Sequence, residues 1–169
     1  CPRPAWPGRA PLVSTGRRTS RQVALQVLYA ADLAGRGEGG PSPERIEAAF
    51  ESVGGHFELP EGARAFAKEL VTGVAAHRDR IDALLAGHAT HWRLERMAAV
   101  DRNLLRLAIY EMAWGGTPSS VAIDEAVDLA RRFGSDRSSG FVNGVLYWWA
   151  RTRAEGESGP AREHAEEGS

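Results

Sequence analysis

The chain has 169 residues, of which 43% are hydrophobic and 25% are charged, and its formal net charge at pH 7 is −1. This length suits one domain or two small ones, and this composition excludes a collagen-like or wholly disordered chain. The nearly neutral total gives no sign of a polyanion partner recruited by net charge alone.

The charge is distributed unevenly along the chain. Residues 1–36 contain six arginines and one acid, Asp32, so this part carries +5, whereas residues 151–169 contain three arginines and five glutamates and carry −2. A basic start on a mildly acidic body can orient a polyanion. The asymmetry therefore directs attention to the N-terminal part of the chain.

Cys1 is the only cysteine, so the chain can form neither an internal disulfide framework nor a cysteine-based zinc site. The longest uncharged run of note, residues 138–150, is too short to span a bilayer, and no apolar stretch near the start resembles a signal peptide. We therefore expect a soluble, cytoplasmic protein without a membrane segment.

The two ends of the chain have the composition of disordered segments. Four prolines among residues 1–16 fix φ and remove hydrogen-bond donors, which predicts a disordered basic arm. Residues 153–169 are rich in Glu, Gly, Ser and Ala and lack a periodic apolar face, which predicts a disordered acidic tail. The folded part is expected between them, over residues 17–152.

Helical periodicity dominates the first half of this folded part. Apolar residues four apart predict a helix over about 18–34, which the glycine-rich residues 35–40 end. Ser42 and Pro43 are typical of an N-cap and a first helical position, so a second helix should run to the glycines at 54–55. A third helical stretch, formed by one or two helices, follows from Pro60 to about residue 86.

The second half contains the most apolar segment. Residues 94–114 carry two apolar stripes, which predicts a helix packed on several sides at the centre of the fold. Another helix should run from 117 to 133, and Ser135 or Asp136 should cap the last one. Gly144 goes against helix propensity inside this last helix, and a close helix crossing would explain it.

No segment shows sustained period-two alternation with turn pairs, so we expect an all-α fold. The periodic segments predict a compact bundle of about seven helices in two subdomains. These subdomains would cover about residues 17–88 and 89–152, with a hinge near residues 87–93.

Several familiar motifs are weak here. Residues 35–40 satisfy G-x-G-x-x-G, but a helix precedes them and Glu38 would repel phosphate, so a flexible loop is expected. His77, His88 and His91 are too scattered for a metal site. Neither a tuned carboxylate pair nor a nucleophile elbow is evident, so we expect no enzymatic activity and no cofactor.

Two further groups of side chains have simple structural interpretations. Three carboxylates followed by two arginines on one amphipathic helix favour a solvated face: Asp124, Glu125, Asp128, Arg131 and Arg132. In the aromatic run 147–149, Trp149 can join the apolar face while Tyr147 and Trp148 point elsewhere. For this run packing is favoured, and a partner or base-stacking surface stays open.

The strongest chemical signal is the run RRTSR at residues 17–21, which leads into the first helix. Guanidinium groups can hold phosphate oxygens in bidentate pairs, and helix N-terminal amides add positive potential. Gln22, Gln26 and Tyr29 follow on the same helix, and amide and aromatic groups can read or stack on unpaired bases. From charge alone, a solvated basic terminus remains an equal alternative.

Three stretches together resemble the NusB family of bacterial transcription antitermination factors. They are the arginine-rich start running into A-x-Q-x-L-Y at 17–29, the central helix VDRNLLRLAIYEM at 100–112, and the closing pair of helices from 118 to 146. The likeness covers roughly residues 17–150, and three motifs in the right order are far more specific than any one alone. The resemblance implies a seven-helix fold in two subdomains.

The resemblance also implies a function and partners. It implies binding to the boxA RNA of ribosomal RNA leader transcripts together with the ribosomal protein NusE, and assembly with NusA, NusG and RNA polymerase. At matching positions, the RNA side would include Arg17, Arg18, Arg21 and Tyr29, and we add Gln22 as the neighbouring amide.

Two positions depart from the family pattern. Thr19 stands where relatives often carry a basic residue, and Arg137 stands in a loop where relatives often carry acids, so Arg137 would restore a phosphate contact there. Two alternatives remain open: a NusB-like domain of an RNA 5-methylcytosine methyltransferase fragment, and a helical protein-interaction module without RNA affinity.

Overall fold

The structure is a computed structural model that describes residues 16–34, 41–86 and 94–157. Within these three ranges the chain is helical and contains no strand, which confirms the expected all-α class. The elements are α1 (Gly16–Ala34), α2 (Pro43–Gly54), α3 (Glu61–Ala86), the 3₁₀ turn η1 (Leu94–Arg96), α4 (Ala99–Ala113), α5 (Ser119–Phe133) and α6 (Ser138–Glu157). None of these helices is long and apolar enough to cross a membrane.

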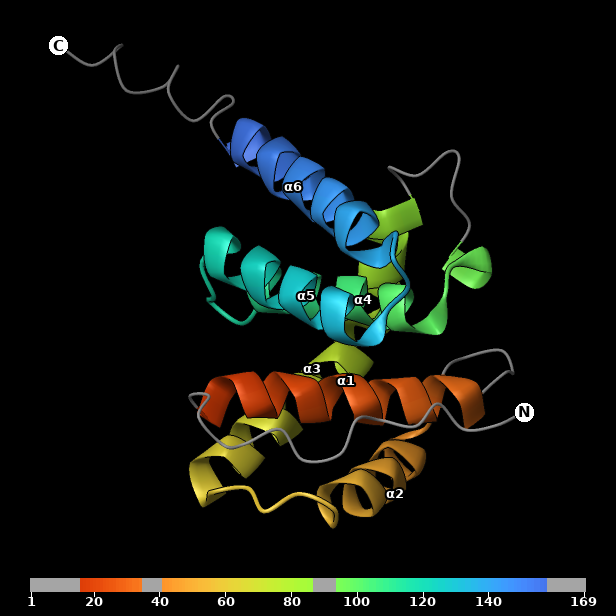
Figure 1. Cartoon of the computed structure of the whole chain (residues 1–169). Helices are drawn as coiled ribbons and strands as arrows, with labels where there is room; N and C mark the ends of the chain where they lie inside the picture. Colours follow the sequence, from red (N-terminus) through yellow and green to blue (C-terminus); the bar gives the residue numbers. More distant parts are fainter. Residues whose placement is uncertain (1–15, 35–40, 87–93, 158–169) are drawn as a thin grey trace, which may run out of the picture.

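Helix α4 lies at the centre of the fold. It packs against α1 and α3 on one side and against α5 and α6 on the other (Figure 1). Leu104, Leu105 and Ile109 on α4 are fully buried, so both apolar stripes of this segment face neighbours. Burial on several sides confirms the central position that the two stripes predicted.

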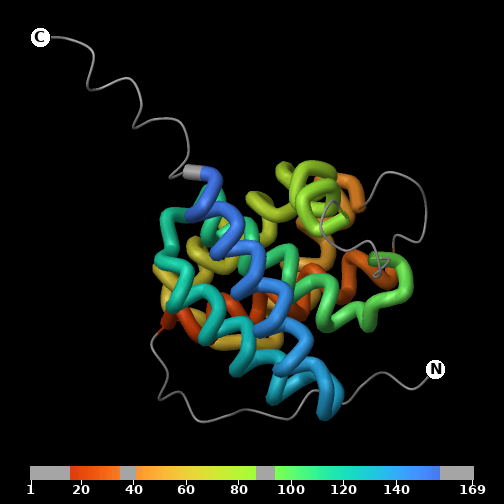
Figure 2. The backbone as a smooth tube through the Cα atoms, turned by 90° about the horizontal axis from the view of Figure 1, so that it is seen from above, coloured from red at the N-terminus to blue at the C-terminus, as the bar shows by residue number. Residues whose placement is uncertain are grey.

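The remaining helices form two groups around α4. Helices α1, α2 and α3 pack together, and α5 and α6 form a hairpin that covers the other side of α4 (Figure 2). The expected division into two subdomains stays a prediction, and residues 87–93 lie outside the described ranges. The contacts of α4 with α1 and α3 join the two groups into one core.

Local sequence signals explain where several helices begin. The Ser42 side chain accepts a hydrogen bond from the backbone N–H of Arg45, and Pro43 occupies the first position of α2, as expected. The stretch after Pro60 is one continuous helix, α3, rather than two.

Gly73 lies in the middle of α3, where a Cβ would collide with the ring of Tyr110 on α4. The absence of a side chain at this position thus allows close packing of α3 and α4.

A group of ion pairs also joins α1, α3 and α4. Arg102 donates from Nη2 and Nε to Asp32 Oδ2 at 2.6 and 2.9 Å, and Arg106 donates from Nε to Asp82 Oδ1 at 2.8 Å. Arg102 Nη1 also donates to the Leu94 carbonyl at 2.9 Å, which fixes η1 against α4. Burial would raise the pKa of Asp32, but hydrogen bonds and charge from Arg102, with smaller contributions from nearby groups, outweigh it and lower this pKa.

The last helix differs from expectation at both ends. It begins at Ser138, and the Arg137 carbonyl accepts from the N–H of Phe141, so Arg137 stands at the cap position predicted for Ser135 or Asp136. It continues to residue 157, into the segment expected to be a disordered tail. One tertiary and one local contact stabilise this end: Arg153 Nη1 donates to the Met112 carbonyl of α4 at 2.7 Å, and within α6 its guanidinium lies 5.5 Å from the Trp149 ring centroid.

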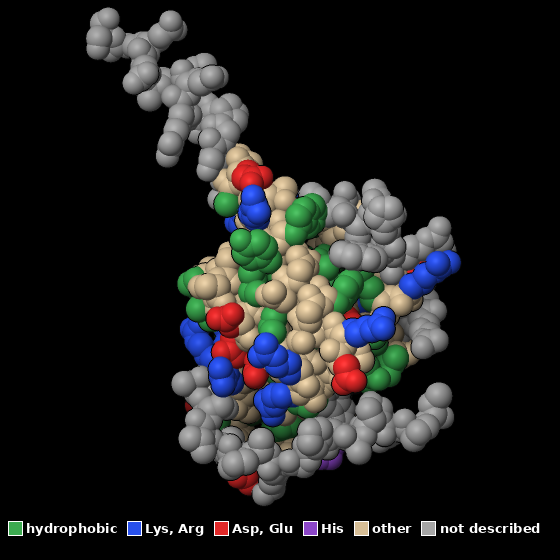
Figure 3. Space-filling model, turned by 45° about the horizontal axis from the view of Figure 1, so that its top comes forward, with side chains coloured by type: hydrophobic (Ala, Val, Ile, Leu, Met, Phe, Trp, Pro, Cys, Tyr) green, Lys and Arg blue, Asp and Glu red, His purple; other side chains and the backbone are tan. Residues whose placement is uncertain are grey.

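The outer face of α6 corrects a further expectation. A Cβ on Gly144 would meet nothing within 4 Å, so no close helix crossing explains this glycine, and Asn143 beside it is exposed. Trp149 is buried as predicted, whereas Tyr147 and Trp148 are 60% and 40% exposed. Hydrophobic side chains accordingly appear on the surface over α6 (Figure 3).

Candidate nucleic-acid interface

The N-terminal end of α1 carries three arginines that the fold places in three different environments. Arg17 is exposed, and its guanidinium carbon lies 4.8 Å from the centroid of the Phe66 ring on α3. No carboxylate pairs with Arg17 among the residues described. Its hydrogen-bonding edge is therefore available to a phosphate or another acceptor from outside.

Arg18 is also on the surface and connects α1 to α5. Its Nε donates to Glu125 Oε1 at 3.1 Å, and its side chain remains 55% exposed. The hydrogen bond and charge of Glu125, together with the charge of Asp128, raise the pKa of Arg18. The Glu125 side chain is only 15% exposed, but the Arg18 end of the pair faces solvent, so a phosphate can compete with Glu125 for the guanidinium.

Arg21 lies inside the protein. Its Nε donates to both carboxylate oxygens of Glu111 at 2.9 and 3.1 Å, its Nη2 lies 2.8 Å from Oε1, and the two side chains are 5% and 3% exposed. This burial argues against the direct RNA contact expected for Arg21, because the pair would have to break first. Arg21 instead fixes α1 against the C-terminal end of α4.

A second contact anchors the first turn of α1 on α3. The Ser20 hydroxyl is buried and lies 2.7 Å from both the Gly16 and the Ala63 carbonyl oxygens. A Cβ on Gly16 would approach that of Ala63 to 3.3 Å, so the two helices are close here. The arginines at 17 and 18 therefore project from a helix end that is held in place.

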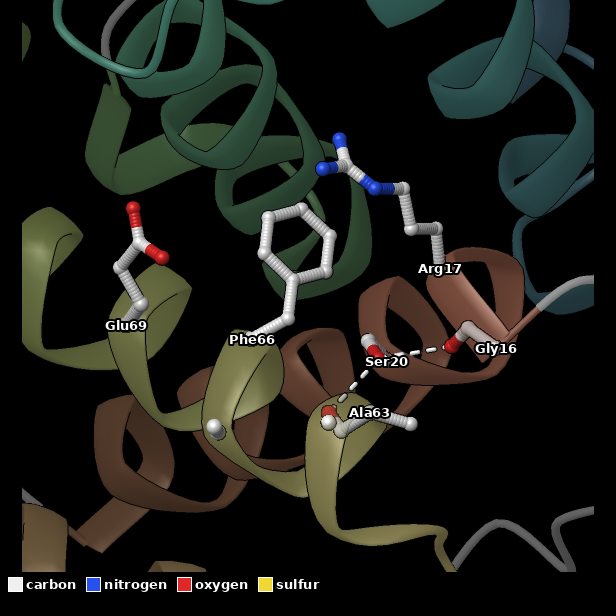
Figure 4. A pocket seen from close by; sticks show the side chains of 8 residues that line it. Gly16, Arg17, Ser20, Ala63, Phe66 and Glu69 are labelled. Atoms are coloured by element: carbon white, nitrogen blue, oxygen red, sulfur yellow. Dashed lines mark hydrogen bonds between the residues drawn. The ribbon is translucent and has the colours of Figure 1, made fainter.

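A cavity of about 470 Å³ opens between these first turns of α1 and α3. It is lined by Gly16, Arg17, Ser20, Gly62, Ala63, Ala65, Phe66 and Glu69. In Figure 4 the Phe66 ring stands between the side chains of Arg17 and Glu69. The sequence analysis did not predict Phe66 and Glu69 as site residues. The available signal was the four-residue spacing of Arg17 and Arg21, which places them on one face of α1, and in the structure this face meets Phe66.

The other predicted site residues are spread along α1 and the loop from α5 to α6. Gln22 and Tyr29 are half-buried on α1, and Gln26 is buried. Arg137 is exposed in the loop between α5 and α6, and Figure 1 shows this loop away from the N-terminal end of α1. A Cβ on Gly134 would collide with the Ser138 side chain, whose Oγ accepts from the N–H of Ser135, so this loop has a defined path.

The structure thus brings Arg17 and Arg18 to one edge, buries Arg21, and places Arg137 elsewhere.

The surface around this edge is mixed in sign. Figure 3 shows basic and acidic side chains next to one another below α6, as the solvated face predicted for α5 implies. No group of three or more His, Cys, Asp or Glu residues in the described ranges could hold a metal ion. His88, His91 and the glycine-rich residues 35–40 lie outside those ranges.

Comparisons with known proteins agree with this geometry. Residues 18–151 match the model of the NusB family. The chain is similar to the transcription antitermination protein NusB of Solibacter usitatus (strain Ellin6076), with 45% identity over 86% of this chain and 96% of the relative. Among solved structures it resembles T. maritima NusB, with a TM-score of 0.70 and 30% identity over 82% of this chain and 93% of the other.

A second similar structure contains partners. It is a crystal structure of the antitermination factors NusB and NusE in complex with dsRNA, which matches with a TM-score of 0.69 and 26% identity over 81% of this chain and 97% of the other. These relatives are antitermination proteins, in agreement with the expectation that the chain is not an enzyme.

Proposed function

The chain belongs to the NusB family of transcription antitermination proteins, and on that premise we propose that it binds the boxA RNA of ribosomal RNA leader transcripts. The observation that carries the proposal is the pair of exposed arginines, Arg17 and Arg18, on an anchored helix end. Guanidinium groups held in place can engage phosphates with little loss of side-chain freedom.

The proposed RNA path starts at this helix end. Arg17 and Arg18 would contact phosphates, while Gln22 and Tyr29 farther along α1 would contact unpaired bases. Arg137 would add a phosphate contact from the α5–α6 loop. Arg21 is assigned a positioning role, since its guanidinium is held by Glu111.

We further propose NusE as the protein partner, with NusA, NusG and RNA polymerase completing a cytoplasmic antitermination complex. A structurally similar NusB is found with NusE and dsRNA, which supports the first of these partners. If both ligands bind the same folded state, NusE should raise RNA affinity and RNA should raise NusE affinity by the same factor. Relatives that are 45% and 44% identical to the chain are named as antitermination proteins, which favours this function over that of a methyltransferase domain.

Filter binding of boxA RNA at two salt concentrations, with and without NusE, tests the proposal. The wild-type protein should lose affinity as salt rises: the logarithm of the binding constant should fall with the logarithm of the salt concentration, with a slope of about 0.7 per phosphate contact on single-stranded RNA. The variant Arg17→Ala/Arg18→Ala should bind more weakly and lower that slope by about 1.4.

A matched control is Arg45→Ala/Arg96→Ala, which removes two exposed arginines from α2 and η1 and causes the same change in net charge. Equal binding by the two double variants would contradict the proposed site. Absence of RNA binding by a wild-type protein that still binds NusE would instead support a protein-interaction module.

A further inference from the structure

The cavity between α1 and α3 is open to the surface, and two of its lining residues, Ser20 and Ala63, also anchor α1 on α3. Its volume, about 470 Å³, lies within the range of small-molecule sites. Two of its lining residues, Gly62 and Ala65, are exposed and small, and a Cβ on Gly62 would meet nothing within 4 Å. A flat ligand can therefore approach the backbone of α3 closely.

Two guanidinium groups lie over the aromatic ring in this cavity, and the exposed one, Arg17, can leave, whereas the buried Arg21, 5.6 Å from the ring centroid, stays in place. Arg17 lies over the Phe66 ring, and such an exposed cation–π contact is worth only about 2- to 5-fold in an equilibrium constant. Stacking of a nucleobase on an aromatic ring is worth about 5- to 150-fold. A base can thus replace Arg17 on Phe66 while the guanidinium turns to the phosphate of the same nucleotide.

The carboxylate of Glu69 adds a polar group beside the ring. It is exposed, and no hydrogen bond to this carboxylate is formed within the described parts of the chain. An ionised carboxylate only accepts hydrogen bonds, so it favours a base that carries an exocyclic amine. Cytosine, adenine and guanine have such an amine, whereas uracil offers only a ring N–H between two carbonyl oxygens, which would repel the carboxylate.

We propose that this cavity binds one unpaired, amine-bearing nucleobase of the bound RNA, stacked on Phe66 and hydrogen-bonded to Glu69. The inference rests on the proposed RNA-binding function, because Arg17 lines the cavity and also belongs to the proposed phosphate-binding edge. A nucleotide whose phosphate contacts Arg17 brings its own base close to the cavity. This favours RNA over an aromatic side chain of a protein partner.

Filling the cavity without harming the fold gives the sharpest test. In Gly62→Leu, the new side chain starts in open space at the cavity wall, and leucine favours a helix more than glycine does. The matched control is Gly156→Leu in the last turn of α6, where a Cβ also meets nothing within 4 Å. Both variants should remain helical, so a difference between them reports on the cavity.

The RNA probe is boxA RNA in which one nucleotide at a time lacks its base. With the wild-type protein and with Gly156→Leu, the loss of one particular base should weaken binding by about 5- to 150-fold. Gly62→Leu should bind intact RNA more weakly by a similar factor and should be insensitive to the loss of that base. If the effects of Gly62→Leu and of base removal on the binding free energy are additive at every position, the cavity proposal is wrong.

Base preference tests the role of Glu69. The wild-type protein should prefer cytosine over uracil at the sensitive position, and Glu69→Gln should reduce this preference because an amide can also donate to the uracil carbonyls. An unchanged preference would overturn the assignment of Glu69.

Titration with the four nucleoside monophosphates, followed by the amide resonances of Ala63 and Ala65, separates this inference from the proposed function. Shifts in the wild type and in Gly156→Leu but not in Gly62→Leu would support the cavity even if boxA RNA failed to bind. Salt-dependent RNA binding without these shifts, and without coupling between Gly62→Leu and base removal, would agree with the proposed function and overturn the proposal that the cavity binds a base. Perturbation of the same resonances by NusE alone would also overturn it, in favour of a protein ligand.

Discussion

The buried pair of Arg21 and Glu111 should be among the most sensitive points of the fold. Replacement by Arg21→Met keeps an apolar stem in the core but leaves the Glu111 carboxylate, 3% exposed, without its cation. Among the residues that the structure describes, only the Thr117 hydroxyl, 3.3 Å from Oε1, would still bond this carboxylate. Because an uncompensated buried charge costs about 3–5 kcal/mol, the free energy of unfolding should fall by that amount.

Urea unfolding followed by circular dichroism measures this loss. With a slope of about 2 kcal/mol per molar urea, the midpoint should fall by about 1.5–2.5 M. Since domains have a total stability of about 5–15 kcal/mol, the variant would fold only marginally if the wild-type stability lies at the lower end of this range. A loss below about 1 kcal/mol at an unchanged slope would refute the buried, bidentate pair.

The double variant Arg21→Met/Glu111→Leu keeps the test valid if the single variant unfolds. Replacement of both charges by apolar groups is often neutral or stabilising, so most of the lost stability should return. This double variant should also bind RNA with the affinity of the wild type. A double variant that regains the full stability of the wild type, and so keeps α1 anchored, but binds RNA clearly more weakly would show that Arg21 contacts RNA itself and that its assigned positioning role is wrong.

Three other changes have defined outcomes. The pKa of Asp32 is lower in the folded state, so Asp32 stabilises this state above its unfolded pKa of about 3.8, and the contribution is lost as pH falls through the folded pKa. Urea unfolding at several pH values should therefore show that the stability difference between wild type and Asp32→Asn shrinks on acidification. Glu125→Gln should release Arg18, which tightens RNA binding in filter assays and leaves the melting temperature unchanged. Gly73→Ala should lower the unfolding free energy by about 1–3 kcal/mol in urea, since the new Cβ collides with Tyr110, although alanine favours a helix.

Each of these expectations has a contrary result. A stability difference for Asp32→Asn that is constant down to acid pH would mean that Asp32 has an ordinary pKa in the folded protein. Weaker RNA binding by Glu125→Gln would mean that Glu125 holds Arg18 in its binding position. A stabilised Gly73→Ala protein would show that the contact between α3 and α4 is looser than described.

The helices could be predicted from the sequence because their signals are local. The cap at Ser42, the double stripe on α4 and the apolar stripe on α1 each lie within a few residues of the structure that they determine. The end of α6 could not be predicted in this way. Arg153 holds it through a carbonyl 41 residues away, at Met112.

The candidate site could be predicted only in part, for the same reason. A run of arginines indicates positive charge, but the side chain that turns inward is decided by Glu111, which lies 90 residues from Arg21. The cavity combines Arg17 with Phe66 across two helices, and neither residue indicates the other in the sequence. At Gly144 the sequence predicted a contact that does not exist: its low helix propensity suggested a close helix crossing that the fold does not make.

Stability and the proposed function depend on each other at the start of α1. Arg21 and Ser20 hold this helix to α4 and α3, while Arg17 and Arg18 beside them face outward. A cation on a fixed helix end loses less freedom on binding than one on a loose arm, so the inward contacts contribute to RNA affinity without touching RNA. Loss of Ser20's hydroxyl should therefore weaken RNA binding through the position of Arg17, and it should do so in a protein that keeps its helical content.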